Sequence, residues 1–458
     1  MSLPLTPLTA LSSIDGRYGD RTSPLREYLS EYALIKYRVF IQIEYLIALS
    51  LEKEVKECKK IPNALQKKLR AISAQFSLQD ARTIKKLERI TNHDVKAVEY
   101  FLQKKLISFR SQRLLPFLHF ALTSEDINNI AYTLMWRDAI RYQYLPHLRH
   151  VHAMISTASK KWASIPLLSL THGQSASPTT LGKEFSVFAY RLSRGLHRLE
   201  CHEYSGKLNG AVGTWAAHVI AYPNTDWMKF SKRFLLTLNL VSSTHTTQIE
   251  SGDSLAQSYL HLAQINTVLL DFARDMWLYC MRGHIRLRRL SKEVGSSTMP
   301  HKINPIHFEN AEGNLGIANA QLYHLASTLP ISRLQRDLSG STLIRTQGTP
   351  LAHSYAACHT IISGLDRITP HNESIESELD AHWEVLAEAV QIVLRRAGRQ
   401  DAYEIVKQHT RGMNFTREDY LSLVEQLPLS QKDKAMLHKL TPALYIGYAK
   451  RLARSIAN

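Results

Sequence analysis

The run Gly295–Pro305, with the sequence GSSTMPHKINP, carries the side chains best suited to chemistry in this chain. Its glycine gives the backbone conformational freedom, Ser296 offers a hydroxyl, and Lys302 supplies a cation. The amides in the first turn of a helix that follows Asn304 add positive potential. Together these groups suit an anionic substrate. Because a nearby cation and oriented donors favour an alkoxide, they indicate that Ser296 serves as a base.

His172 is a second candidate for proton transfer. It lies in Thr171–Gln174, between Pro166 and Pro178, and is expected on a connection between helices. Histidine exchanges protons near neutral pH, so His172 is a candidate acid.

Both the glycine-serine loop and His172 have a simpler, non-catalytic interpretation. An isolated Gly-Ser-Ser is more often a surface loop with a helix cap, and a lone loop histidine, one of 21 here, is more often merely solvated.

Two further polar clusters stand where helices are expected to begin. In Thr91–Asp94, capping of the helix by Asn92 or Asp94 competes with a role in binding. In Thr123–Asn129, Ser124 is expected to cap a helix whose first turn is acidic, and the hydroxyls are expected to serve both as cap and as ligand.

Helical spacing governs the segments that must position these residues. Apolar residues recur at steps of three and four over Leu262–Tyr279, Phe308–Leu325 and Leu148–Trp162. Asn304-Pro305 predicts an N-cap followed by proline at the first helical position, so the glycine-serine loop leads directly into a long helix. Pro146 predicts a break or kink.

Long helices joined by short polar loops predict an all-α protein, and alternating β-type patterns are scarce. We expect three domains. They are an N-terminal helical domain at 1–111, a central long-helix bundle at 112–364, and a C-terminal helical domain at 365–458, whose shorter pieces are broken at Pro370, Pro428 and Pro442.

Composition narrows the functional classes. Hydrophobic residues make up 44% and charged residues 21%, and no apolar run approaches the roughly 20 residues that cross a bilayer. The N-terminus has no export leader, so the cytoplasm is the expected location. Four dispersed cysteines without a CxxC pair argue against disulfides and a zinc site.

The net charge of +17 raises nucleic-acid binding as an alternative. However, the basic residues are dispersed and lack an RNA-binding fold motif or an aromatic–basic ladder. An anionic small molecule is therefore the expected partner, with no nucleic acid and no membrane.

The loop at 295–305 resembles the GSSxMPxKxNP stretch of the fumarase/aspartase superfamily and matches every fixed position. Other motifs resemble the adenylosuccinate lyases of that superfamily, especially their longer, proteobacterial-type branch. They are DGRY at 15–18, TNHDVKAVEYFL at 91–102, TSEDINN at 123–129, HGQ at 172–174, TQIE at 247–250, and RLQRDL with STLIR at 333–345. The chain departs from the family pattern at Ser175, Ser251-Gly252, Gly340 and Thr346.

This resemblance implies a β-elimination in purine nucleotide biosynthesis. Fumarate would leave adenylosuccinate, giving AMP, and the succinylated carboxamide ribotide, giving AICAR, with Ser296 as base and His172 as acid. The implied substrate-binding residues are Arg17, Tyr18, Asn92, His93, Asp94, Thr123, Ser124, Gln248, Lys302, Asn304, Asn310, Arg336, Ser341, Thr342 and Arg345. The family also implies a homotetramer with a twenty-helix core and sites shared between subunits.

No metal or organic cofactor is expected, since the sequence contains no metal-ligand cluster, Walker-type loop or Rossmann glycine pattern. Another fumarate-releasing member of the superfamily, such as argininosuccinate lyase, fumarase or aspartase, is the alternative enzyme. A non-catalytic scaffold on the same bundle is the alternative outside catalysis.

Overall fold

The computed structural model describes residues 4–289, 298–299, 301–410, 412 and 415–456. Helices dominate these residues, and the strands among them form three two-stranded sheets. The prediction of a mostly helical fold is therefore confirmed. Contacts divide the chain into two compact units. The first unit comprises Met1–His147, Gly195–Thr267 and Asn314–Ala357, and the second comprises Leu148–Arg194, Val268–Gly313 and Cys358–Asn458.

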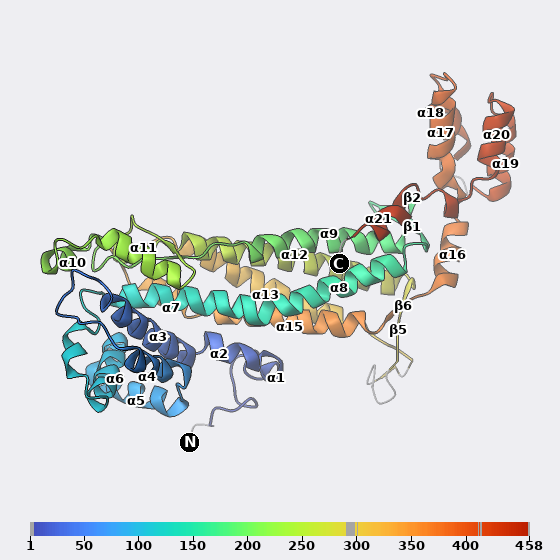
Figure 1. Cartoon of the computed structure of the whole chain (residues 1–458). Helices are drawn as coiled ribbons and strands as arrows, with labels where there is room; N and C mark the ends of the chain where they lie inside the picture. The colour runs from blue at the N-terminus through green and yellow to red at the C-terminus, as the bar shows by residue number, and fades with distance from the viewer. Residues whose placement is uncertain (1–3, 290–297, 300, 411, 413–414, 457–458) are drawn as a thin grey trace. The chain divides into compact units, whose positions relative to one another are not determined.

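Helices of 4 to 19 residues build much of the first unit (Figure 1). They are α1 (Gly19–Thr22), α2 (Arg26–Leu29), α3 (Glu31–Leu49), α4 (Asn63–Ala74), α5 (Leu78–Thr91), α6 (Asp94–Ser108), α7 (Ser124–Ala139), α10 (Ala216–Ala221), α11 (Trp227–Thr237) and α14 (Ser339–Ile344). Helix α3 packs against α4 and α7, and α5 packs against α6. Strands β3 (Ser205–Gly206) and β4 (Val241–Ser242) pair in parallel.

Five long helices carry the periodic apolar segments. They are α8 (Leu145–Lys161), α9 (Leu181–Glu200), α12 (Asp253–Met281), α13 (Ile306–Thr328) and α15 (Gly348–Leu365). The predicted stripes are buried: Leu262 and Phe272 of α12, and Phe308 and Leu322 of α13, are at most 1% exposed. At Pro146 the chain does not break. A π-helical turn, Ile140–Tyr144, joins α7 to α8, and the Leu145 amide donates to the Ile140 carbonyl, so the helix continues through the proline in the first turn of α8.

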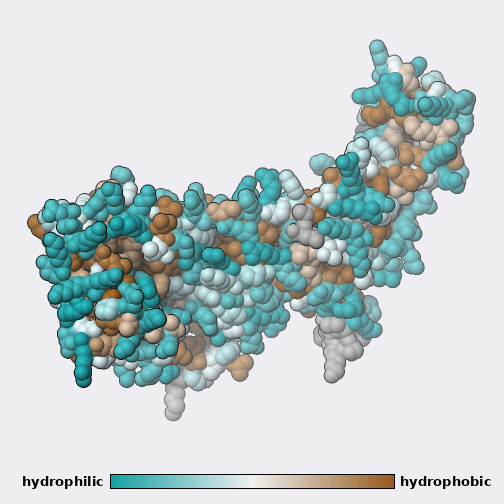
Figure 2. Space-filling model, in the orientation of Figure 1, coloured by the Kyte–Doolittle hydropathy of each residue, from teal (hydrophilic) through white to brown (hydrophobic). Residues whose placement is uncertain are grey.

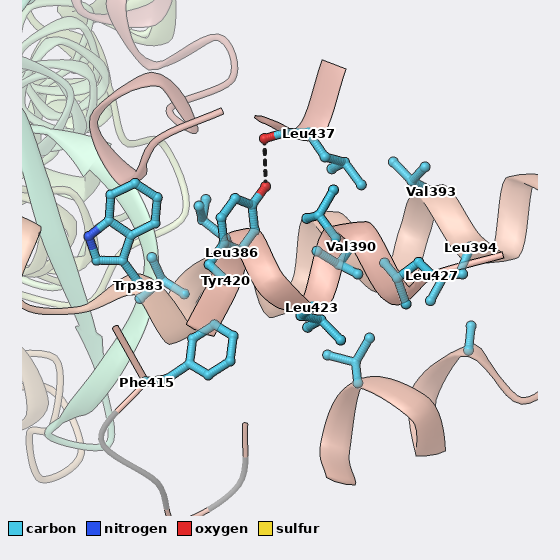
Figure 3. Close-up of a cluster of buried hydrophobic side chains, with 14 of the residues drawn as sticks. Trp383, Leu386, Val390, Val393, Leu394, Phe415, Tyr420, Leu423, Leu427 and Leu437 are labelled. Carbon is cyan, nitrogen blue, oxygen red and sulfur yellow. Dashed lines mark hydrogen bonds between the residues drawn. The ribbon is translucent and has the colours of Figure 1, made fainter. Parts of the chain in front are cut away.

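The second unit contains the hairpin of β1 (Pro166–Thr171) and β2 (Gln174–Thr180), which pair antiparallel, and the antiparallel pair β5 (Ile285–Leu287) and β6 (Ile368–Pro370). Its other helices are α16 (Asn372–Asp380), α17 (Ala387–Arg396), α18 (Ala402–Thr410), α19 (Arg417–Gln426), α20 (Gln431–His438) and α21 (Ala449–Arg454). A buried cluster that includes Trp383, Leu386 and Leu423 holds α17 and α19 (Figure 3). Within it, the Tyr420 hydroxyl donates to the Leu437 carbonyl at 2.8 Å.

Two predicted helix caps were wrong by one residue. Thr123, not Ser124, caps α7, in a capping box with Asp126. His93 caps α6, in place of Asn92 or Asp94, because its imidazole accepts from the Lys96 amide. Helix α13 begins at Ile306, directly after Pro305, and the Phe308 amide donates to the Pro305 carbonyl at 3.0 Å.

On the face shown in Figure 2, hydrophilic residues cover most of the surface around the N-terminal helices. Among the residues that the structure describes, no helix is both long enough and apolar enough to span a bilayer. Large apolar side chains are nevertheless exposed on the long helices, for example Ile317 and Tyr323 of α13.

Candidate active site

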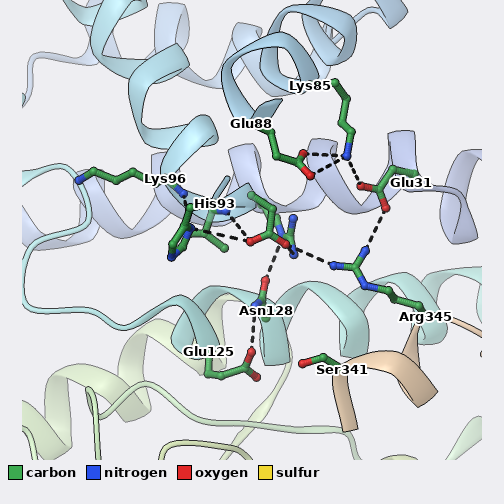
Figure 4. A network of polar contacts seen from close by, with 12 residues as sticks. Glu31, Lys85, Glu88, His93, Lys96, Glu125, Asn128, Ser341 and Arg345 are labelled. Carbon is green, nitrogen blue, oxygen red and sulfur yellow. Dashed lines mark hydrogen bonds and ion pairs between the residues drawn. The ribbon is translucent and has the colours of Figure 1, made fainter. Parts of the chain in front are cut away.

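A polar network in the first unit centres on Arg38 of α3, whose side chain is 1% exposed (Figure 4). Its guanidinium donates to Asp94 Oδ2 at 2.7 Å and to Asn128 Oδ1 at 2.9 Å. The Asn128 amide in turn donates to Glu125 Oε1 at 2.9 Å. One buried cation therefore joins the N-terminal parts of α6 and α7, where the sequence places two of its polar clusters.

Arg345 reaches the same carboxylate from the C-terminal end of α14. It donates to Asp94 Oδ2 at 3.3 Å and to Glu31 Oε2 at 3.2 Å, and its side chain is 44% exposed. Lys85 donates to Glu31 at 3.2 Å and to Glu88 at 2.8 Å. The cations and carboxylates thus alternate along the network, as Figure 4 shows.

These contacts set the charge of Asp94. Burial raises the pKa of its carboxyl, but Arg38, the Val95 amide and Arg345 outweigh burial, so the pKa lies below its ordinary value. Asp94 is therefore ionised at neutral pH and orients both guanidinium groups.

Arg336 is the centre of a second set of polar contacts in the first unit. Its guanidinium lies 3.0 Å from Glu125 Oε1 and donates to Ser341 Oγ at 3.3 Å and to Gln248 Oε1 at 3.2 Å. Arg336, Ser341 and Glu125 line a cavity of about 60 Å³. The Arg336 guanidinium thus joins two other predicted site residues, the nearby Ser341 and Gln248, which is 88 positions away in the sequence.

His93 presents a defined face of its ring. Its Nδ1 accepts from the Lys96 amide at 3.2 Å, so in the neutral ring the proton is on Nε2. The side chain is 52% exposed, which leaves Nε2–H available as a donor. Asn92 is exposed at the end of α5 in a left-handed conformation, and Thr123 and Ser124 are half-buried at the start of α7.

The other predicted residues of the first unit lie outside both sets of contacts. Arg17 is exposed in the turn before α1, and Thr342 is exposed on α14. Tyr18 is half-buried, and its hydroxyl accepts from the Asn314 amide at 3.3 Å. The structure does not bring Arg17 or Thr342 to Arg38 or Arg336.

In the second unit, His172 stands at the tip of the β1–β2 hairpin. Its φ is 53° and that of Gly173 is 73°, so the two form a two-residue turn with both residues left-handed. The His172 side chain is exposed. Beside the turn, Ser175 Oγ lies 3.2 Å from His382 Nδ1, which lies 2.7 Å from Glu384 Oε1. The connection predicted for His172 is therefore the turn of a β-hairpin, and the hairpin contacts His382 through Ser175.

Ser296, the predicted base, lies outside the described residues. Of the predicted residues that follow it, Lys302 is exposed, with its amide donating to the Met299 carbonyl at 3.1 Å. Asn304 and Asn310 are both half-buried, at the start of α13.

Arg38, Glu125 and Asn128 were not among the predicted site residues. Glu125 and Asn128 belong to the TSEDINN motif, so the motif itself was the signal. For Arg38 the signal is a charged residue on an apolar helical stripe, one turn from Leu34 and Ile35.

Comparisons with known proteins identify the fold and the family of the chain. The sequence model of a lyase family matches residues 16–319, and that of the adenylosuccinate lyase C-terminal domain matches 332–446. Among solved structures, fumarate lyase from Mesorhizobium sp. BNC1 superimposes with a TM-score of 0.73 at 19% identity, covering 95% of this chain and 97% of that one. The 3-carboxy-cis,cis-muconate lactonizing enzyme from Pseudomonas putida has a TM-score of 0.69 at 21% identity, covering 94% and 95%. The fold is thus that of the lyase superfamily, and the chain is an enzyme of the carbon–nitrogen lyase class.

Sequence relatives define the family further. Adenylosuccinate lyase of Escherichia coli K12 is 45% identical over 446 residues, covering 97% of this chain and 98% of that protein. The enzyme of Vibrio cholerae is 45% identical over 450 residues, with 98% and 99% covered, and that of Dictyostelium discoideum is 43% identical over 456 residues, with 97% and 98% covered. The chain belongs to the adenylosuccinate lyase family, and the predicted family is confirmed.

Proposed function

We propose that this enzyme releases fumarate from adenylosuccinate, giving AMP, and from the succinylated carboxamide ribotide, giving AICAR. The observation that carries the proposal is the match to adenylosuccinate lyases over nearly the whole chain. The test is spectrophotometric conversion of adenylosuccinate to AMP by the purified protein. Argininosuccinate, malate and aspartate are the comparison substrates, and faster turnover of any of these would favour the alternative lyases.

Proton transfer is assigned to Ser296 and His172. The proton removed lies beside a carboxylate and is weakly acidic, so a base must work while cationic groups stabilise the dianionic aci-carboxylate that forms. Lys302 and Asn304 are suited to bind the succinyl carboxylates. The exposed imidazole of His172 supports its role as the acid that protonates the departing nitrogen.

Phosphate binding is assigned to Arg17, Tyr18, Arg336, Ser341 and Arg345. The remaining pocket is assigned to Asn92, His93, Asp94, Thr123, Ser124, Gln248, Asn310 and Thr342. Support comes from Arg336 and Arg345, whose planar guanidinium groups can pair with phosphate in a bidentate manner. In the free enzyme these cations contact Glu125 and Asp94, so a bound anion would exchange one anionic partner for another.

The reaction as proposed needs neither metal nor organic cofactor, because elimination beside a carboxylate proceeds by acid–base chemistry and charge stabilisation. Small-molecule nucleotides are the proposed partners, with no nucleic acid. RNA binding with a steep salt dependence would contradict that assignment.

A homotetramer with shared sites is also proposed. It is supported by α13, where Gly313 and Gly316 each face open space and Ile317 and Tyr323 are exposed. Light scattering of the purified protein measures the mass. Mixing inactive Ser296→Ala and His172→Ala variants tests site sharing, since subunit exchange should restore part of the activity only if one site uses both chains.

The division into domains at 1–111, 112–364 and 365–458 stays a prediction, as does a cytoplasmic location. Limited proteolysis near residues 111 and 365 tests the first, and cell fractionation tests the second.

A further inference from the structure

Lys207 is a buried cation in the first unit that the proposed mechanism does not use. Its side chain is 0% exposed, as is that of its partner Asp126. The ammonium donates to the Gly210 carbonyl at 2.8 Å and to the Gln248 carbonyl at 2.8 Å, and it lies 3.0 Å from Asp126 Oδ1. An ammonium has three protons, so each of them has an acceptor.

Asp126 ties the same cation to the start of α7. Its Oδ1 also accepts from the Asn209 amide at 3.0 Å, while Oδ2 accepts from the Thr123 amide at 2.8 Å. One turn later, the Asn129 side chain accepts from the Lys207 amide at 2.8 Å and donates to the Lys207 carbonyl at 3.0 Å. Both the backbone and the side chain of Lys207 are therefore fixed to α7.

Gln248 is the residue that connects Lys207 to Arg336. Its carbonyl accepts from Lys207, and its side chain donates to the Ala211 carbonyl at 3.0 Å and accepts from Arg336 at 3.2 Å. Arg336 in turn pairs with Glu125, which precedes Asp126 on α7. The contacts close a ring that runs from α7 through Lys207, Gln248 and Arg336 back to α7.

We propose that Lys207 is a positioning residue for substrate binding, which sets Gln248 and Arg336 at a fixed place against the first turn of α7. The inference rests on the proposed function, since Gln248 and Arg336 are assigned there to the substrate. Lys207 is itself fully buried, so it acts through Gln248 and does not touch the substrate.

The segments around Lys207 have other attachments, so the fold does not depend on this cation alone. The side-chain amide of Asn209 donates to Thr246 Oγ1 at 2.7 Å. Gly213 has a φ of 77°, and a Cβ there would come within 2.1 Å of the Thr246 carbonyl oxygen, so the two backbones are in close contact. Loss of the ammonium should therefore loosen Gln248 and not release the whole segment.

The test is Lys207→Met, which keeps the length of the side chain and removes its charge and donors. With adenylosuccinate as substrate, KM is expected to rise about tenfold or more while kcat stays within about threefold. Ser258→Ala is the matched control. It removes the buried acceptor of the Trp136 indole, which also contacts the Tyr204 hydroxyl and is not hydrogen-bonded to Gln248 or Arg336, and so should lower stability without acting through Gln248. A Lys207→Met variant with the wild-type KM overturns the inference.

Lys207→Met leaves Asp126 buried without its cation, so Asp126→Asn/Lys207→Met is the second variant. The same rise in KM is expected there. If neither variant folds by circular dichroism, Lys207 serves the fold alone and the inference is overturned.

A double-mutant cycle with Gln248→Ala tests the route of action. If Lys207 acts through Gln248, adding Lys207→Met to Gln248→Ala should change KM by less than about threefold, whereas additive effects contradict the inference. A wild-type protein that does not cleave adenylosuccinate refutes the proposed function instead, which separates the two failures.

Discussion

Two carboxyl groups in different units, Asp94 and Asp275, have pKa values that are shifted in opposite directions. In the first unit, Asp94 faces the guanidinium groups of Arg38 and Arg345, and its pKa lies below the ordinary value although burial works against this. In the second unit, the pKa of Asp275 of α12 is raised to about 6. Burial is the largest cause, the charges of Asp271 and Glu184 add to it, and Arg191 compensates only in part. In the first region cations outweigh the burial of the carboxyl, and in the second region they compensate it only in part.

The same contrast extends to the assigned functions. The residues proposed to bind substrate in the first unit are held by ion pairs and side-chain hydrogen bonds around Arg38 and Arg336. The proposed acid, His172, is instead held by the backbone of a two-residue turn, and its ring is exposed. Binding groups gain from fixed positions, whereas a proton donor needs access to the leaving atom. Changes in the first region should therefore affect KM and stability, and changes to the acid and base should affect kcat.

Ser296→Ala should have the largest effect on turnover. Loss of the base is expected to lower kcat by about a hundred- to ten-thousand-fold while substrate still binds, measured by steady-state kinetics and by calorimetric titration. Ser297→Ala, which removes the neighbouring hydroxyl, is the control. A change confined to KM would remove Ser296 from the role of base.

His172→Ala should lower kcat by a similar factor of about a hundred or more, because the departing nitrogen then leaves without its proton. His409→Ala, an exposed histidine on α18, is the matched control and should keep full turnover. Full turnover of His172→Ala would show that the acid is another group.

Arg38→Met should mainly affect stability and binding. It removes the buried donor of Asp94, which keeps Arg345 and the Val95 amide, and leaves the buried Asn128 oxygen without the guanidinium, which should lower the free energy of unfolding by about 3 kcal/mol and raise KM. Arg70→Met breaks the more exposed pair with Glu44 and should cost less than about 1 kcal/mol. The free energy of unfolding is measured by urea denaturation. If Arg38→Met and Arg70→Met lower it equally, the buried network contributes no more to stability than the surface pair.

Asp275→Asn should give the smallest effect, and its sign depends on pH. The folded-state pKa of about 6 lies above the ordinary 3.8, so the contribution of Asp275 to stability is full below about pH 4 and is lost as pH rises through 6. The asparagine variant escapes this loss. Its Tm should match the wild type near pH 4 and exceed it at pH 7, as measured by calorimetry. A lower Tm at pH 7 would mean that the ionised carboxylate is stabilising.

Much of the helical framework was predictable from the sequence. The stripes over Leu262–Tyr279 and Phe308–Leu325 appear as α12 and α13, since apolar spacing of three and four residues is a local property. Helix caps were harder to predict. Thr123 and Ser124 have the same chemistry, and only the backbone angles choose which hydroxyl bonds to the amide three residues on.

The hairpin at His172 was missed because β1 and β2 have no strict alternation of apolar and polar residues. Their burial follows from packing, including that of β1 against α16. The motifs nevertheless brought Gln248, Arg336 and Ser341 into the predicted site, and the structure places these three together.

The sequence by itself determined the helices and the family, because periodicity and contiguous motifs depend on residues close together in the chain. The tertiary structure decided which charges meet. Arg38 reaches Asp94 across 56 positions, and Arg345 reaches the same carboxylate across 251. Such pairs form only where packed helices bring their side chains together and exclude water, and no local pattern records that choice.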